Sequence, residues 1–242
     1  MDFLKILKSF EDFVYEALTW LILLPQTLLR IVFSPRRMAS YAERELASAD
    51  NEQRFGDSIS PPLLLILCIL IAHLVDLEIR AQTPTDSGSL ADALLASEQN
   101  LLLYRTIAFG VWSLAGAACY LVGERIPINR QTLRGPFYEQ CYLVAPFALV
   151  VSIGGSMLLI GTDAELPGAC MILAAALWFW CVQIVWFSHR MRIALWRSAV
   201  AATITLLIGA GINLGVGHAL SHVQSGKAAT AADGAQSKVG SH

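Results

Sequence analysis

Residues 135–155 read GPFYEQCYLVAPFALVVSIGG, and this stretch favours a membrane fold over a soluble one. An apolar run of this length approaches the roughly 20 residues with which an α-helix crosses the ~30 Å hydrocarbon layer of a bilayer. Two residues are unusual for such a run, because Glu139 carries a charge and Pro146 removes a helical hydrogen bond. The stretch therefore predicts a membrane span with a polar beginning and a kink at Pro146.

The composition of the 242-residue chain agrees with this prediction. Hydrophobic residues make up 55% of the chain and charged residues only 15%, whereas soluble proteins contain about 25% charged residues. The net charge of −2 gives no indication of a nucleic-acid partner. The five cysteines form no CxxC pair, so we interpret them as packing residues rather than metal ligands or disulfides.

The apolar residues occur in blocks that predict an all-α fold, a polytopic membrane helix bundle. Five blocks are long enough to be transmembrane helices: 61–80, 101–123, 136–160, 167–188 and 193–217. We expect Gly135 and Pro136 to begin the third span. Glu139 would then lie in or just past the first helical turn, where the helix dipole favours an anion and Arg134 or Arg190 can pair with it.

The N-terminal 60 residues predict a cytosolic and interfacial region. Apolar residues recur at helical spacing from Phe3 to Ala17, with charged residues on the opposite face, which indicates an amphipathic helix. Residues 17–33 are also apolar, but Pro25 and Arg30 divide them, and an arginine near a span centre is costly. We therefore interpret 3–33 as an amphipathic helix lying in the interface. A sixth span is the alternative.

The predicted domain organisation follows from these segments. Residues 1–60 form the interfacial and charged region, with a short helix over 38–48. Residues 61–220 form the five-span bundle, and residues 221–242, rich in Gly, Ala and Ser, are expected to be a disordered tail.

The loops between the spans predict the orientation of the chain. Residues 124–135 and 189–197 each contain three arginines, whereas 76–100 and 161–166 are mainly acidic. The positive-inside rule then places the N-terminus in the cytosol and the C-terminus outside. Arginine outnumbers lysine, which favours a bacterial source and hence the inner membrane.

Polar residues within the predicted spans are the candidates for function, because placing them in lipid is costly. Asp76 or Glu78 can form an ion pair with Arg105, but the favoured expectation is that these side chains extend to the outer headgroups. Asn213 is expected to hydrogen-bond to another helix. The candidate functional residues are His73, Asp76, Arg105, Glu139, Pro146, Gln183 and Asn213.

A four-residue spacing of glycines in the last span predicts a close contact between helices. Gly211 and Gly215 would lie on one helix face, where small residues let two backbones approach. We expect this face to support packing or association into an oligomer. The expected partners are thus the lipid bilayer and proteins at the cytosolic face.

Two stretches resemble a known family. LRIVFSPRRMASYAEREL (29–46), followed by SISPPLLLILC (58–68), is similar to the opening of bacterial Yip1-domain proteins, and GPFYEQCYLVAPFALV (135–150) resembles their third span. The resemblance implies a five-helix integral membrane protein with a cytosolic N-terminus. Eukaryotic members of the family act in vesicle traffic with small GTPases, and bacterial members are often called permeases.

These observations lead to three functional hypotheses. The first is a non-enzymatic Yip1-like membrane protein that organises or recruits partners at the cytosolic face. The second is a small permease or transporter component that moves a solute along spans one to three. A membrane enzyme is least favoured, because the sequence contains no catalytic motif, cofactor motif or metal-ligand spacing that we recognise.

Overall fold

The computed structural model describes residues 3–48, 55–81, 98–160 and 162–215, and every regular element in these ranges is a helix. The all-α prediction is therefore confirmed for these residues. The predicted tail, residues 221–242, lies outside them. The helices are α1 (Phe3–Phe33), α2 (Pro35–Ala47), α3 (Pro61–Ala81), α5 (Glu98–Gly123), α6 (Arg130–Ile160), α7 (Thr162–Met191) and a C-terminal helix (Leu195–Gly215).

Within the described residues, six helices are long and apolar enough to cross a membrane, which is typical of an integral membrane protein. Five of them correspond to the predicted spans. The sixth is the segment Leu7–Phe33 of α1. By length and composition, α1 is therefore also a candidate membrane span. Its position in the structure bears on whether it crosses the membrane.

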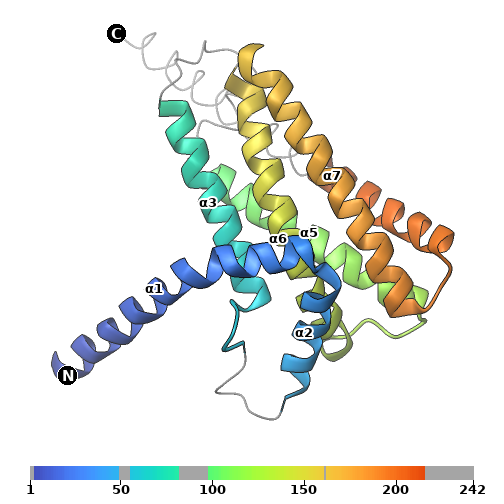
Figure 1. Ribbon diagram of the computed structural model, residues 1–242, viewed down its shortest axis with the longest axis horizontal. Coiled ribbons are helices and arrows are strands. Elements are labelled where there is room, and N and C mark those ends of the chain that lie inside the picture. Colours follow the sequence, from blue (N-terminus) through green and yellow to red (C-terminus); the bar gives the residue numbers. More distant parts are fainter. Residues whose placement is uncertain (1–2, 49–54, 82–97, 161, 216–242) are drawn as a thin grey trace, which may run out of the picture.

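α1 differs from the other long helices in its direction. It runs across α3 and α6 rather than alongside them, and its N-terminal half projects beyond the bundle (Figure 1). Near its other end, Thr27 and Ile31 are fully buried. The apolar side of α1 stays exposed along its length, at Leu7, Phe10, Val14, Leu18, Leu21, Leu29 and Val32.

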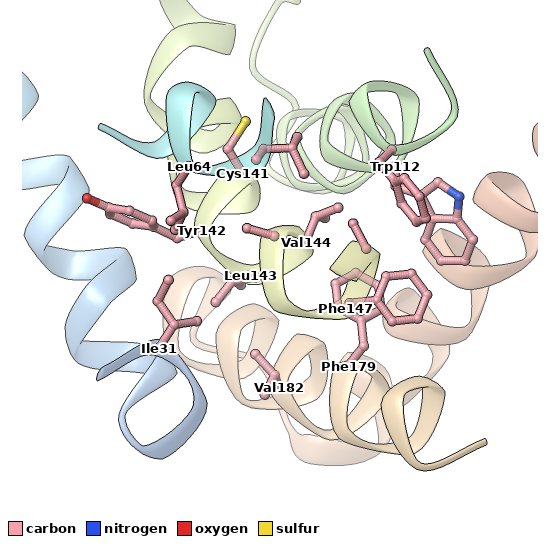
Figure 2. Packing of buried hydrophobic residues seen from close by; sticks show 14 of the residues in the cluster. Ile31, Leu64, Trp112, Cys141, Tyr142, Leu143, Val144, Phe147, Phe179 and Val182 are labelled. Atoms are coloured by element: carbon pink, nitrogen blue, oxygen red, sulfur yellow. The ribbon is translucent and has the colours of Figure 1, made fainter. Parts of the chain in front are cut away.

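α6 lies at the centre of the bundle and packs against α2, α3, α5 and α7. Figure 2 shows three of its residues, Leu143, Val144 and Phe147, inside the buried cluster. The Phe147 ring stacks on Phe179 of α7, with the centroids 4.5 Å apart. Trp112 of α5 lies beside the same ring at 5.0 Å. Aromatic packing thus fills the middle of the molecule.

The start of α6 differs from the prediction. The helix begins at Arg130, because Asn129 Oδ1 accepts hydrogen bonds from the backbone N–H groups of Gln131 and Thr132, both at 2.9 Å. This is an N-cap, which satisfies amides that have no partner within the helix. Pro136 therefore lies inside the helix. Glu139 is well beyond the first turn, so the predicted dipole contact is wrong.

One end of the bundle is rich in arginine. The connections from α5 to α6 and from α7 to the C-terminal helix meet there, and Arg190 at the end of α7 lies over the ring of Tyr120 on α5. The segment before α3 reaches the same end, where Tyr142 donates a hydrogen bond of 2.8 Å to the Ile59 carbonyl. We call this region, with Arg125, Arg130, Arg134, Arg190 and Arg192, the arginine-rich end.

Two glycines let α6 and α7 approach each other backbone to backbone, and in the last helix the tightly packed glycine is Gly209, where a Cβ would lie 2.5 Å from Trp112 Cδ2. A Cβ on Gly154 would lie 2.9 Å from the Gly168 carbonyl oxygen, and a Cβ on Gly168 would lie 2.8 Å from that of Gly154. A Cβ on Gly211 or Gly215 would meet nothing within 4 Å among the described residues. Those two glycines therefore do not pack against another described helix of the same chain.

Candidate functional site

Glu139 lies inside the protein at the arginine-rich end, although it carries an ionisable carboxyl group. Its residue exposure is 2%. Trp186 of α7 donates a hydrogen bond of 2.7 Å from its indole nitrogen to Glu139 Oε2. The indole thereby satisfies its own donor as well as one carboxylate oxygen, which is the usual requirement for a buried tryptophan.

Arg190 connects this buried carboxylate to α2. Its Nη2 is 3.4 Å from Glu139 Oε1, and its Nη1 donates hydrogen bonds of 2.7 Å to both carboxylate oxygens of Glu43. Of the two arginines that the sequence allowed as partners of Glu139, Arg190 is therefore the one that pairs with it. Arg134 lies instead over the ring of Tyr138 on its own helix.

α2 presents Glu43 at the edge of its buried apolar side, one helical turn after Ala39. Met38, Ala39 and Ala42 are buried, and α2 packs mainly on α6. Pro35 occupies the first helical turn, where its missing N–H costs nothing. Burial raises the pKa of Tyr41 above its usual value, so its hydroxyl stays neutral at physiological pH.

A small pocket opens between α2 and α7 beside these charges. Its volume is about 30 Å³. Of the arginines at the arginine-rich end, only Arg190 lines this pocket. The lining residues are Arg36, Ala39, Ser40, Glu43, Glu139, Trp186, His189 and Arg190.

A second group of charged residues lies at the opposite end of the bundle. Arg105 Nη2 is 3.5 Å from Asp76 Oδ1, so the ion pair that the sequence allowed is present. Arg105 also donates a hydrogen bond of 3.1 Å to Ser156 Oγ on α6. The side chains of Arg105 and Asp76 are only 9% and 1% exposed. They are therefore buried between α3, α5 and α6 rather than extended outward. His73, three residues before Asp76, is also buried, with 6% of its surface exposed.

Sequence reasoning selected Gln183 but missed its partner. Gln183 Nε2 donates a 2.6 Å hydrogen bond to Gln140 Oε1, and Gln140 Nε2 donates a 3.2 Å bond to Gln183 Oε1. Both residues are fully buried. A Cβ on Gly116 of α5 would lie 2.5 Å from Gln140 Oε1, so α5 can pack on the pair only because this residue is glycine. Gln140 could have been selected from the sequence, because it is a second side-chain amide in an apolar span.

Tyr142 was also missed as an anchor. Figure 2 shows its hydroxyl pointing away from the Phe147 side of the cluster. Besides its bond to the Ile59 carbonyl, the hydroxyl lies 3.2 Å from Ser58 Oγ. Tyr142 thus fixes the segment that leads into α3. Pro146, one turn later, is buried within a continuous α6, and the kink there stays a prediction.

The predicted contact of Asn213 and the predicted burial of two cysteines are different in the structure. The Asn213 side chain donates to the Gly209 carbonyl of its own helix, at 3.0 Å. Its backbone carbonyl, rather than its side chain, accepts a hydrogen bond from Tyr104 of α5. Cys68 and Cys141 are buried as expected for packing residues, whereas Cys170 and Cys181 are exposed.

In the part of the chain that the structure describes, no group of three or more His, Cys, Asp or Glu side chains is arranged to hold a metal ion. Comparison with family models, curated proteins and solved structures gave no match. The resemblance to Yip1-domain proteins therefore remains a prediction. The described residues form an all-helical bundle with membrane-length apolar helices. Its two charged sites are the Glu43–Arg190–Glu139 junction, in which Glu139 is buried, and the buried Asp76–Arg105 pair.

Proposed function

We propose that the chain is a Yip1-like integral membrane protein with five transmembrane helices, whose arginine-rich end faces the cytosol and recruits protein partners. In this proposal α1 lies in the cytosolic interface, the N-terminus is cytosolic, and the C-terminus is outside a bacterial inner membrane. The arginines at one end of the bundle support this orientation through the positive-inside rule.

The position of α1 supports the five-span arrangement. A sixth span would run alongside the others, whereas α1 runs across them near the arginine-rich end (Figure 1). Its apolar residues, including Phe10 and Leu21, are exposed on one side, and Lys8 and Asp12 lie on the other. A helix of this kind lies in the plane of the interface with its apolar side in the acyl region.

The observation that carries the recruiting function is the fixed position of α2. The Glu43–Arg190–Glu139 junction and the buried side of α2 hold a short charged helix on the arginine-rich end. Its exposed residues include Arg36, Arg37, Glu43 and Arg44. A rigid helix that presents charges of both signs is suited to bind a protein surface of complementary charge.

Crosslinking in native membranes tests this proposal. Glu43→Gln and Glu139→Gln should each reduce the yield of crosslinked partner several-fold. The first change removes the ion pair between α2 and α7, and the second removes a carboxylate that holds Arg190 in place for Glu43. Glu165→Gln is the matched control, since Glu165 is exposed in the first turn of α7. Unchanged partner yield in both test variants, with normal insertion, would contradict recruitment through α2.

One observation favours the second candidate, a small permease. The Asp76–Arg105 pair is buried where α3, α5 and α6 meet, and intramembrane ion pairs often mark a solute or ion pathway. Arg105→Gln should then change the uptake of small anions, cations or amino acids by proteoliposomes, with partner yield unaffected. Wild-type proteoliposomes that take up none of these solutes would argue against the permease.

A further inference from the structure

The pocket between α2 and α7 has a buried negative group at its floor. Glu139 is 2% exposed. Its Oε2 accepts the Trp186 indole hydrogen bond. Its Oε1 makes no hydrogen bond, because the contact with Arg190 Nη2 at 3.4 Å is an ion pair without hydrogen-bond geometry. Buried carboxylate oxygens normally accept hydrogen bonds. The floor of the pocket therefore presents an acceptor that lacks a donor.

The charges around the pocket do not cancel locally. Two carboxylates, Glu43 and Glu139, share one guanidinium, that of Arg190. This leaves one negative charge in the inner part. Arg36 and His189 line the pocket but are exposed, so they lie at its mouth. Arg36 has no ion-pair partner among the described residues. A guest that is cationic at its leading end and anionic a few ångströms behind would balance both regions.

The size of the pocket limits the cation that can enter. About 30 Å³ is room for roughly two water-sized groups. A primary ammonium has this size and carries three N–H donors, one of which can bond to Glu139 Oε1. A trimethylammonium group is much larger and has no N–H. Quaternary ammonium groups are bound by cages of several aromatic side chains, and Trp186 is the one Trp, Tyr or Phe side chain that lines this pocket.

We propose that this pocket binds an ethanolamine phosphate group, with the ammonium on Glu139 and the phosphate against Arg36 and His189, and that its source is the headgroup of a phosphatidylethanolamine lipid. The pocket lies at the ends of membrane-length helices, where headgroups are found. The proposal depends on the membrane position of the bundle but not on partner recruitment.

Native mass spectrometry of the full chain from detergent tests the proposal. Phosphatidylethanolamine and phosphatidylcholine with identical acyl chains are added in equal amounts. We expect the wild type to retain the ethanolamine lipid about tenfold more strongly, a preference of roughly 1.4 kcal/mol. Equal retention of the two lipids would overturn the proposal. Crosslinking to partners is measured separately, so failure here does not count against recruitment.

Variants locate the binding in the pocket. Arg36→Gln should remove most of the preference, whereas Arg37→Gln should keep it, because Arg37 is exposed in the same turn but does not line the pocket. Ser40→Leu should also remove it by filling the space. Both arginines are exposed, so neither variant should impair folding, which circular dichroism verifies. Equal loss in Arg36→Gln and Arg37→Gln would show general charge attraction and overturn the site.

A competition experiment identifies the source of the group. Free phosphoethanolamine at millimolar concentration should displace the retained lipid only partly, since the acyl chains add membrane contacts. Binding of free phosphoethanolamine without any retention of the lipid would assign the pocket to a soluble ligand and overturn the lipid source. Displacement by phosphocholine at the same concentration would contradict the size and N–H requirements.

Discussion

Arg190 shares its guanidinium between two carboxylates of very different exposure. The Glu43 side chain is 48% exposed, whereas that of Glu139 is 3% exposed. Removing one partner of a buried pair leaves an uncompensated charge and costs about 3–5 kcal/mol. An exposed pair contributes only about 0.2–1 kcal/mol. The contribution of Arg190 to the free energy of unfolding therefore comes mainly from its contact with Glu139.

We predict that Arg190→Met strongly lowers the thermal stability of the detergent-purified protein, and that Glu43→Gln lowers it slightly. The double variant Arg190→Met with Glu139→Gln should recover much of the loss, because the remaining buried amide carries no charge. Thermal unfolding followed by tryptophan fluorescence measures all three. No recovery in the double variant would mean that Arg190 stabilises the protein through packing rather than charge.

The contact between Gly116 and Gln140 leads to a second prediction. Gln140 could move away from an added methyl group only by breaking its two hydrogen bonds with Gln183, so Gly116→Ala should cost about 1–3 kcal/mol. Gly110→Ala on the same helix is the matched control, because a Cβ there meets nothing within 4 Å. It should be neutral or stabilise by up to about 1 kcal/mol. Equal melting temperatures for the two variants would contradict a tight contact between Gly116 and the Gln140–Gln183 pair.

At the scale of single helices, the amphipathic character of α1 can be tested directly. Phe10→Asp places a charge on the exposed apolar side and should release the N-terminal part of α1 from lipid. A spin label at position 13 should then become more accessible to water-soluble relaxation agents. Lys8→Asp on the opposite side is the control and should leave the label protected. Protection unchanged in Phe10→Asp would show that this half of α1 does not lie in lipid.

The helices were largely predictable because each is a long apolar run, and all five predicted spans coincide with membrane-length helices. The ends of the helices were less predictable than the helices themselves. The prediction began the third span at Gly135 and Pro136, but capping by Asn129 starts α6 at Arg130. A local cap thus outweighed the proline, which the sequence pattern alone could not indicate.

The candidate sites were predictable in part. Glu139 and Asp76 were selected because charge in an apolar span is costly, and each has an arginine partner. The Gln140–Gln183 pair depends on the rotation of α6 and α7 about their axes, which apolar spans of uniform character do not encode. The role of α2 was missed for a similar reason, since Glu43 is an ordinary surface residue until α2 docks on the bundle.

For the whole molecule, alkaline-phosphatase fusions in a bacterial host test the topology. We expect activity after residues 90, 164 and 230, and no activity after residues 50, 130 and 190, because the arginine-rich connections should remain in the cytosol. An active fusion at residue 50 would mean that α1 crosses the membrane. Inverted activity at all positions would mean that the arginine-rich end faces outward.

The central place of α6 has a consequence for how the protein is made. α3 and α5 pack mainly on α6 and little on each other, yet both are synthesised before it. During that interval Arg105 of α5 lacks its hydrogen bond to Ser156 of α6. The Asp76–Arg105 pair joins α3 directly to α5. It can therefore hold these two spans together during membrane insertion, until α6 is inserted and Ser156 bonds to Arg105. The ion pair is then a contact that forms early in assembly and persists in the finished protein.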